Sequence, residues 1–293
     1  MFEGAHTALV TPFTENGMID TDSFRKLIDK QFDNGIKGVV PVGTTGESAT
    51  LSTEEHHRVV ELAVKHTAKR GLVIAGTGSN STREAVELTQ AAEEGGADAA
   101  LIVTPYYNKP SQEGLFQHYR AISESTELPI ILYSIPGRCH IEIEVDTVVR
   151  LAKECPGIKA IKEAGGVTER VRQLRAALPD DFEILSGDDA LTIDFMKEGG
   201  VGVISVASNL IPKAMADITT AMLEGRVGDA ESLNAKYSGL FSAFLQLDTN
   251  PVPIKAALSL VGDCRAKLRL PMVEMSADKV DELRGILAGL NLI

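Results

Sequence analysis

Short apolar runs alternate with longer amphipathic segments along most of the chain. Eight runs have the length and composition of buried strands: His6–Val10, Gly38–Val42, Leu72–Gly76, Asp98–Val103, Pro129–Tyr133, Ile158–Lys162, Phe182–Ser186 and Val201–Ser205. Between them, apolar residues recur at helical spacing over Asp22–Asn34, Thr53–Lys69, Thr82–Glu94, Gln112–Glu124, Val145–Lys153, Val167–Leu178 and Ala190–Lys197. The pattern therefore predicts eight strands separated by helices.

Apolar strands that alternate with helices indicate a parallel sheet covered on both faces. Eight such units over residues 1–225 predict an α/β fold of the (β/α)8 TIM-barrel class. An open doubly wound sheet is the alternative, but the chain has no G-x-G-x-x-G after the first run and no G-x-x-x-x-G-K. Residues 226–293 carry no further strand run, and three helical segments predict a C-terminal helical extension: Ala230–Leu247, Val252–Val261 and Ala277–Leu290.

Composition narrows the classes of function. The 293 residues are 44% hydrophobic and 24% charged, as in ordinary globular proteins, and the net charge of −12 argues against a nucleic-acid partner. The N-terminus lacks the features of a signal peptide and no stretch is apolar enough to span a membrane, so we expect a cytoplasmic protein without membrane association. Cys139, Cys155 and Cys264 are expected to be reduced thiols, and no histidine spacing suggests a metal site.

One apolar run contains a lysine, in the stretch I-K-A-I-K-E-A-G-G from Ile158. A buried lysine is uncommon because desolvating an ammonium is costly, and the same cost lowers its pKa. The free amine can then attack a ketone and form a Schiff base. Taken alone, the segment favours the plainer interpretation that Lys159 and Lys162 are strand-end charges reaching solvent.

Other strand ends change that balance, because a barrel carries its chemistry at the C-terminal ends of its strands. Lys162, Tyr133 and the pair Thr44 and Thr45 would face one another across the mouth. Lys162 is favoured over Lys159 because it lies at the end of its strand, on the opposite face, above the apolar Ala160 and Ile158. Each feature also has a structural interpretation: Gly43–Ser48 as a turn and helix cap, Tyr133 as a half-buried aromatic, and Gly187–Asp189 as an N-cap.

Six of the eight predicted strands carry segments that resemble the dihydrodipicolinate synthase family of the N-acetylneuraminate lyase superfamily. These are G-V-V-P-V-G-T-T-G-E-S-A-T-L from Gly38, V-T-P-Y-Y-N-K-P-S-Q-E-G from Val103, L-Y-S-I-P-G-R from Leu132, G-I-K-A-I-K-E-A from Gly157, L-S-G-D-D from Leu185 and G-V-I-S-V from Gly202. N-P-V-P-I-K from Asn250 and L-R-L-P-M from Leu268 extend the resemblance into the C-terminal helices. It therefore covers essentially the whole chain.

The resemblance implies condensation of pyruvate with L-aspartate 4-semialdehyde, without a cofactor, on the route to diaminopimelate and lysine. It implies a Schiff base on Lys162, acid-base chemistry by Tyr133, and proton relay through Thr44 and a Tyr107 contributed by the neighbouring subunit of a homotetramer built from dimers. It further implies four substrate-binding positions: Thr45 for the pyruvate carboxylate, Arg138 for the semialdehyde carboxylate, and Gly187 and Ile204 lining the pocket. The chain departs from the family at Ser134, Cys139 and His140, which surround Arg138.

The resemblance also implies a site for L-lysine as a feedback inhibitor at a subunit interface. The matching positions are Ser48, Ala49, His56, Asn80, Glu84 and Tyr106, with Thr53 where sensitive enzymes often have histidine. Two alternatives remain open at this point. One is a Schiff-base aldolase acting on sialic acid or a 2-keto-3-deoxy sugar acid, and the other is a non-catalytic sensor of a keto acid or lysine.

Overall fold

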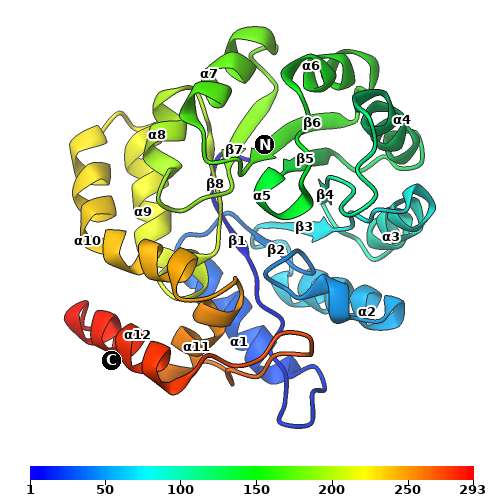
Figure 1. Cartoon of the computed structure of the whole chain (residues 1–293). Coiled ribbons are helices and arrows are strands. Elements are labelled where there is room, and N and C mark those ends of the chain that lie inside the picture. The colour runs from blue at the N-terminus through cyan, green and yellow to red at the C-terminus, as the bar shows by residue number, and fades with distance from the viewer.

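The computed structural model describes all 293 residues, and its centre is a closed barrel of eight parallel strands in sequence order (Figure 1). The strands are β1 (Gly4–Ala8), β2 (Gly38–Val40), β3 (Leu72–Gly76), β4 (Ala99–Val103), β5 (Ile130–Ser134), β6 (Ile158–Glu163), β7 (Glu183–Ser186) and β8 (Gly202–Ser205). Pairing of β1 with β8 closes the ring. The predicted barrel is confirmed, and each strand lies within three residues of its predicted bounds.

Helices surround the barrel, and the three predicted C-terminal helices follow it. They are α1 (Thr21–Asp33), α2 (Thr53–Thr67), α3 (Thr82–Glu94), α4 (Gln112–Ser123), α5 (Pro136–Cys139), α6 (Val145–Glu154), α7 (Thr168–Ala177), α8 (Thr192–Lys197), α9 (Pro212–Leu223), α10 (Val227–Gln246), α11 (Val252–Leu260) and α12 (Ala277–Gly289), with 3-10 turns η1 (Ser48–Thr50) and η2 (Ala207–Asn209). The sequence pattern missed α9, because α10 packs over its outer side and leaves few polar positions to mark a solvent face.

Two apolar layers hold the fold together. A small cluster fills the barrel itself and includes Ala8, Ile74, Leu101, Ala160 and Ile204. A much larger cluster lies between the strands and the helices, where alternate strand residues point outward. A polar side chain on the inner face near a strand end therefore sits on top of a dry apolar plug.

The start of β6 differs from the sequence expectation. The β5–β6 register skips a residue, so that Ile130 pairs with Ile158 and Ile131 with Ala160, and Lys159 is left as an exposed bulge. Ile158 consequently packs in the outer layer, whereas Ala160 packs inside. The expectation that Ile158 lies on the same face as Lys162 was wrong, but the choice of Lys162 as the buried lysine is confirmed.

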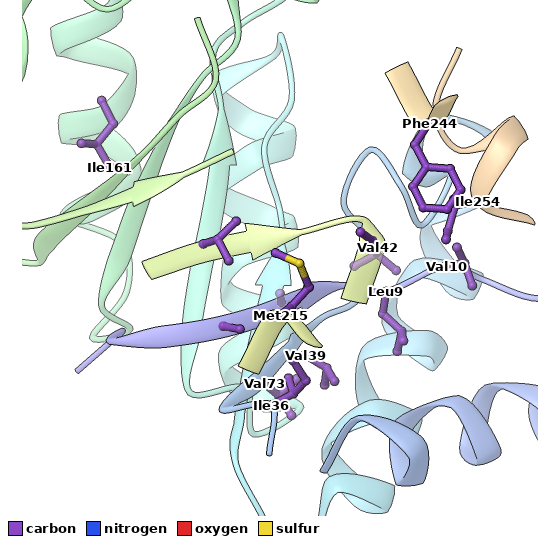
Figure 2. Packing of buried hydrophobic residues seen from close by; sticks show 14 of the residues in the cluster. Leu9, Val10, Ile36, Val39, Val42, Val73, Ile161, Met215, Phe244 and Ile254 are labelled. Carbon is purple, nitrogen blue, oxygen red and sulfur yellow. The ribbon is translucent and has the colours of Figure 1, made fainter. Parts of the chain in front are cut away.

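The C-terminal helices pack back onto the barrel. In Figure 1, α10 runs outside α9 and α11 lies near α1, while α12 packs against α10 and α11. The outer cluster is continuous across this contact: Figure 2 shows Phe244 of α10 and Ile254 of α11 close to Val10 and Val42, just after β1 and β2. The division at residue 225 into two domains stays a prediction. None of the helices has the length and apolarity needed to cross a lipid bilayer.

Candidate active site

Lys162 and Tyr133 lie side by side at the mouth of the barrel. They are direct partners in the β5–β6 register, and the Lys162 Nζ lies 4.3 Å from the centre of the Tyr133 ring. Both side chains are inside the barrel, where Lys162 is 5% exposed and Tyr133 6% exposed. Alternation along the two strands thus brings an amine and a phenol together above the apolar plug.

The electrostatics of this position favour the free amine. Burial lowers the pKa of Lys162 from 10.5 to about 8; the Asp189 carboxylate partly opposes the effect and the Arg138 charge adds to it. A pKa near 8 leaves about a tenth of the amine unprotonated at pH 7, roughly 300 times the fraction at an ordinary lysine pKa. Lys162 is therefore suited to attack a carbonyl.

Tyr133 is held as a neutral phenol. Burial raises its pKa to about 12, against the opposing effects of the Arg138 charge and of a hydrogen bond with Thr44. A neutral phenol next to an amine can donate a proton to an oxygen leaving the carbonyl carbon and recover it through a hydrogen-bonded neighbour. The arrangement matches the pairing of Lys162 and Tyr133 expected from the sequence.

Thr44 and Thr45 lie on a tight loop that follows β2. The Thr11 hydroxyl donates to the Gly46 carbonyl at 2.7 Å, and the Ser48 amide donates to the Gly43 carbonyl at 3.3 Å. Thr45 is buried, and its hydroxyl accepts a hydrogen bond at 3.0 Å from the side-chain amide of Asn250. A residue of the C-terminal extension therefore contacts the loop directly.

Arg138 lies on the single-turn helix α5, which is near the centre of the ring in Figure 1. Its side chain is exposed at the mouth, and one Nη donates to the Asn250 carbonyl at 2.8 Å. The three departures from the family pattern are accommodated locally. Cys139 is buried, His140 ends the turn in a left-handed conformation with φ 55°, and Ser134 is buried with an unpaired hydroxyl.

Gly187 and Ile204 complete the wall around the lysine. Ile204 is fully buried in the inner cluster on β8. Gly187 follows β7, and a Cβ at this position would lie 3.0 Å from the Lys162 Cε and 2.6 Å from the Ala164 Cβ. A larger residue at position 187 would therefore displace the Lys162 side chain.

Asp189 has a larger part in the site than the sequence indicated. Its Oδ2 accepts the backbone amides of Val206 and Ala207 at 3.1 and 2.8 Å, so it links the ends of β7 and β8, while its Oδ1 is buried without a partner. Burial raises its pKa to about 6. It is also the carboxylate that opposes the lowering of the Lys162 pKa.

Tyr107 does not reach this site within the chain. Its side chain is 91% exposed, and its backbone is in the left-handed region with φ 73°. The neighbouring loop is fixed instead by reciprocal contacts: the Asn80 amide donates to the Tyr106 carbonyl at 3.1 Å and the Asn108 amide to the Asn80 carbonyl at 2.8 Å.

The positions expected to bind lysine gather beside the active site. A cavity of about 510 Å³ is lined by five of the six, Ser48, Ala49, His56, Glu84 and Tyr106. Asn80 is not in its wall, but its side-chain amide is hydrogen-bonded to the Tyr106 carbonyl. Thr53 is not in its wall. The same cavity reaches Thr44, Arg138 and Asn250, so the two groups of residues share one hollow.

Comparisons with known proteins agree with the geometry. The sequence model described as "Dihydrodipicolinate synthetase family" matches residues 1–289. A 4-hydroxy-tetrahydrodipicolinate synthase of Citrifermentans bemidjiense is 46% identical over 293 residues, covering all of both chains. The chloride-inhibited dihydrodipicolinate synthase of Acinetobacter baumannii, complexed with pyruvate, has a TM-score of 0.97 at 43% identity and covers all of both chains. The Cyanidioschyzon merolae enzyme with lysine bound has a TM-score of 0.96 at 39% identity, covering 100% of this chain and 99% of its own.

Proposed function

The chain belongs to the dihydrodipicolinate synthetase family, and from this premise we propose that Lys162 is the amine that forms a Schiff base with pyruvate. The reaction is the condensation of pyruvate with L-aspartate 4-semialdehyde to 4-hydroxy-tetrahydrodipicolinate, on the diaminopimelate route to lysine. The observation that supports the proposal most directly is the buried Lys162 amine, with its pKa near 8, against the Tyr133 ring.

The free amine attacks the keto carbon of pyruvate, and loss of water gives an iminium ion. Removal of a methyl proton then gives an enamine, whose carbon attacks the aldehyde of the second substrate. Tyr133 is proposed to shuttle protons at the lysine, and its hydrogen bond with Thr44 supports a route by which the phenol regains its proton. Thr45 is proposed to hold the pyruvate carboxylate.

Arg138 is proposed to bind the carboxylate of the semialdehyde. Its planar guanidinium suits a carboxylate, and one Nη is already held by the Asn250 carbonyl at the edge of the mouth. Gly187 and Ile204 bound the space into which the ketone must fit.

The test of the proposal is reductive trapping. Incubation with pyruvate and borohydride is expected to add one reduced pyruvate adduct to Lys162, located by peptide mass spectrometry. The absence of an adduct on folded protein would refute the Schiff-base proposal, and it would also favour a non-catalytic sensor.

Trapping does not separate this synthase from an aldolase that acts on sialic acid or a keto-deoxy sugar acid. Rates with pyruvate plus aspartate semialdehyde, measured beside rates with N-acetylneuraminate, make that distinction. We expect turnover of the first pair only, because the sugar-acid aldolases usually lack the set of Thr44, Tyr107 and Arg138 that this chain carries. Turnover of N-acetylneuraminate at a comparable rate would overturn the substrate assignment.

A homotetramer of paired dimers is proposed, with Tyr107 entering the neighbouring active site. The Tyr107 side chain is 91% exposed and its backbone is in the left-handed region. Exposing this large apolar ring to water is unfavourable in an isolated subunit, and a neighbouring subunit would cover it. Tyr107→Phe is expected to lower the overall rate while leaving pyruvate adduct formation largely intact. An unchanged rate would exclude the relay role.

L-Lysine is proposed to inhibit the enzyme from the cavity formed by Ser48, Ala49, His56, Glu84 and Tyr106. The Glu84 carboxylate offers a partner for an ammonium group, and the cavity is continuous with Thr44, through which occupancy would reach the site. Initial rates and calorimetry at increasing lysine test this. No inhibition and no heat of binding would refute it.

The cytoplasmic location of the protein remains a prediction.

A further inference from the structure

Asn250 contacts both residues that the proposed function assigns to substrate carboxylates. Its side-chain Nδ2 donates to the Thr45 Oγ at 3.0 Å, and its backbone carbonyl accepts from the Arg138 Nη at 2.8 Å. Asn250 belongs to the C-terminal extension, and its contacts span 205 positions to Thr45 and 112 to Arg138. No other residue is hydrogen-bonded to the side chains of both Thr45 and Arg138.

The segment that carries Asn250 is fixed to the Thr45 loop at a second point. Lys255, on the first turns of α11, is fully buried and donates to the Glu47 carboxylate at 2.5 Å and to the Lys267 carbonyl at 2.8 Å. Glu47 is two residues after Thr45, and its other oxygen accepts the Arg269 backbone amide at 3.1 Å. Ile254, the residue before Lys255, belongs to the same outer apolar cluster as Val42, and Figure 2 shows it next to Val10. Asn250 is thus held in place relative to the loop.

The direction of the Asn250–Thr45 hydrogen bond determines what Thr45 can do. A hydroxyl has one proton and two lone pairs, and the amide NH2 of Asn250 occupies one lone pair. The hydroxyl proton is therefore left free to donate to another acceptor. The Asn250 Oδ1 is buried and has no hydrogen-bond partner, which is unfavourable in a folded protein and calls for an explanation.

We propose that Asn250 is a positioning residue that orients the Thr45 hydroxyl, so that its proton points at the pyruvate carboxylate, while its backbone carbonyl sets the place of Arg138. The inference rests on the proposed function, since Thr45 and Arg138 gain their roles from it. It adds the C-terminal extension to the binding machinery of the barrel mouth.

Two variants of Asn250 distinguish the loss of its hydrogen-bond donor from a change in the size of its side chain. Asn250→Ala removes the amide and leaves the backbone carbonyl, so the KM for pyruvate is expected to rise about three- to tenfold while the KM for the semialdehyde changes less than about twofold. Asn250→Asp keeps the shape but can only accept, so it takes the Thr45 proton and is expected to raise the KM for pyruvate more than the alanine does. Thr249→Ala, an exposed neighbour with no side-chain hydrogen bond, is the matched control and should behave as wild type.

A double-mutant cycle shows whether Asn250 acts through Thr45. In a Thr45→Val background, which already lacks the hydroxyl, Asn250→Ala is expected to add less than about twofold to the KM for pyruvate. Additive effects, a wild-type KM in Asn250→Asp, or equal rises for both substrates together with a lowered melting temperature would each overturn the proposal. Borohydride trapping of the wild-type protein tests the proposed function separately. If the pyruvate adduct forms but the Asn250 variants have unchanged KM values, only the role of Asn250 is refuted.

Discussion

Gly187→Ala tests the geometry around the lysine with a single added carbon. Gly187 directly follows β7, and its amide donates to the Glu163 carbonyl at 2.8 Å. An added Cβ would lie 2.6 Å from the Ala164 Cβ, 3.0 Å from the Lys162 Cε and 3.1 Å from the Glu163 carbonyl oxygen, where ordinary contact begins at 3.4 Å. Two of the three neighbours are backbone or a backbone-fixed methyl, so the movable one is the lysine stem.

The size of the effect follows from these distances. Relief of the contacts moves the Lys162 stem by several tenths of an ångström or more, and a misplacement of about 1 Å at a reacting atom costs on the order of a hundredfold in rate. Overpacking a well-filled site also costs about 1–3 kcal/mol, which is a fall of roughly 2–5 °C in melting temperature for a chain of this size. Adduct formation should therefore fall much more than stability.

The assay is the rate of borohydride-trapped pyruvate adduct, measured by mass spectrometry beside a thermal melt. Gly137→Ala is the matched control, because Gly137 is also at the barrel mouth, on α5, and a Cβ there would have no heavy atom within 4 Å. We expect a large loss for Gly187→Ala and none for Gly137→Ala. Adduct formation at the wild-type rate in Gly187→Ala would refute the placement of the lysine stem against β7.

Three further results are expected. Lys162→Ala should lose the pyruvate adduct and remain folded in circular dichroism, because the change removes a buried polar group; an adduct at another residue would contradict the assignment. The rate of adduct formation should rise about tenfold per pH unit below pH 8 and level off above it, since only the deprotonated amine attacks and its pKa is near 8; a rise continuing beyond pH 10 would mean an unperturbed lysine. Glu47→Gln should lower the free energy of unfolding by about 3–5 kcal/mol in urea titrations, because it leaves the buried Lys255 charge unpaired, and a change below about 1 kcal/mol would show that the charge is solvated.

The barrel was predictable from the sequence because every strand is a short apolar run closed by polar or glycine residues. The lysine was predictable for the same reason, since Lys162 interrupts a run whose other inner-facing residue, Ala160, is apolar. Burial on both faces gives such strands a strong local signature. The β6 bulge was not visible, because a single extra residue at Lys159 leaves the composition of the run unchanged.

Contacts between distant segments were the part that the sequence could not supply. Asp189 looks like an ordinary N-cap in sequence, and its contact with the amides at Val206 and Ala207 exists only once β7 and β8 are neighbours. Lys255 lies in an apolar helix and has a partner, Glu47, 208 positions away. Neither pairing has a periodic signature, because it depends on how whole elements pack.

The charges around Lys162 are suited both to the free amine and to the cation that the proposed Schiff-base chemistry would form from it. Burial keeps the amine partly neutral, but the same burial would penalise the proposed iminium ion, which has a fixed positive charge. Asp189 answers this need, because it is the carboxylate that acts on Lys162 and its pKa of about 6 leaves it mostly ionised at neutral pH. Its position is fixed by two backbone amides, so no reorganisation is needed when the charge appears. The pocket is therefore dry enough to activate the amine and polar enough, on the side of Asp189, to hold the cation.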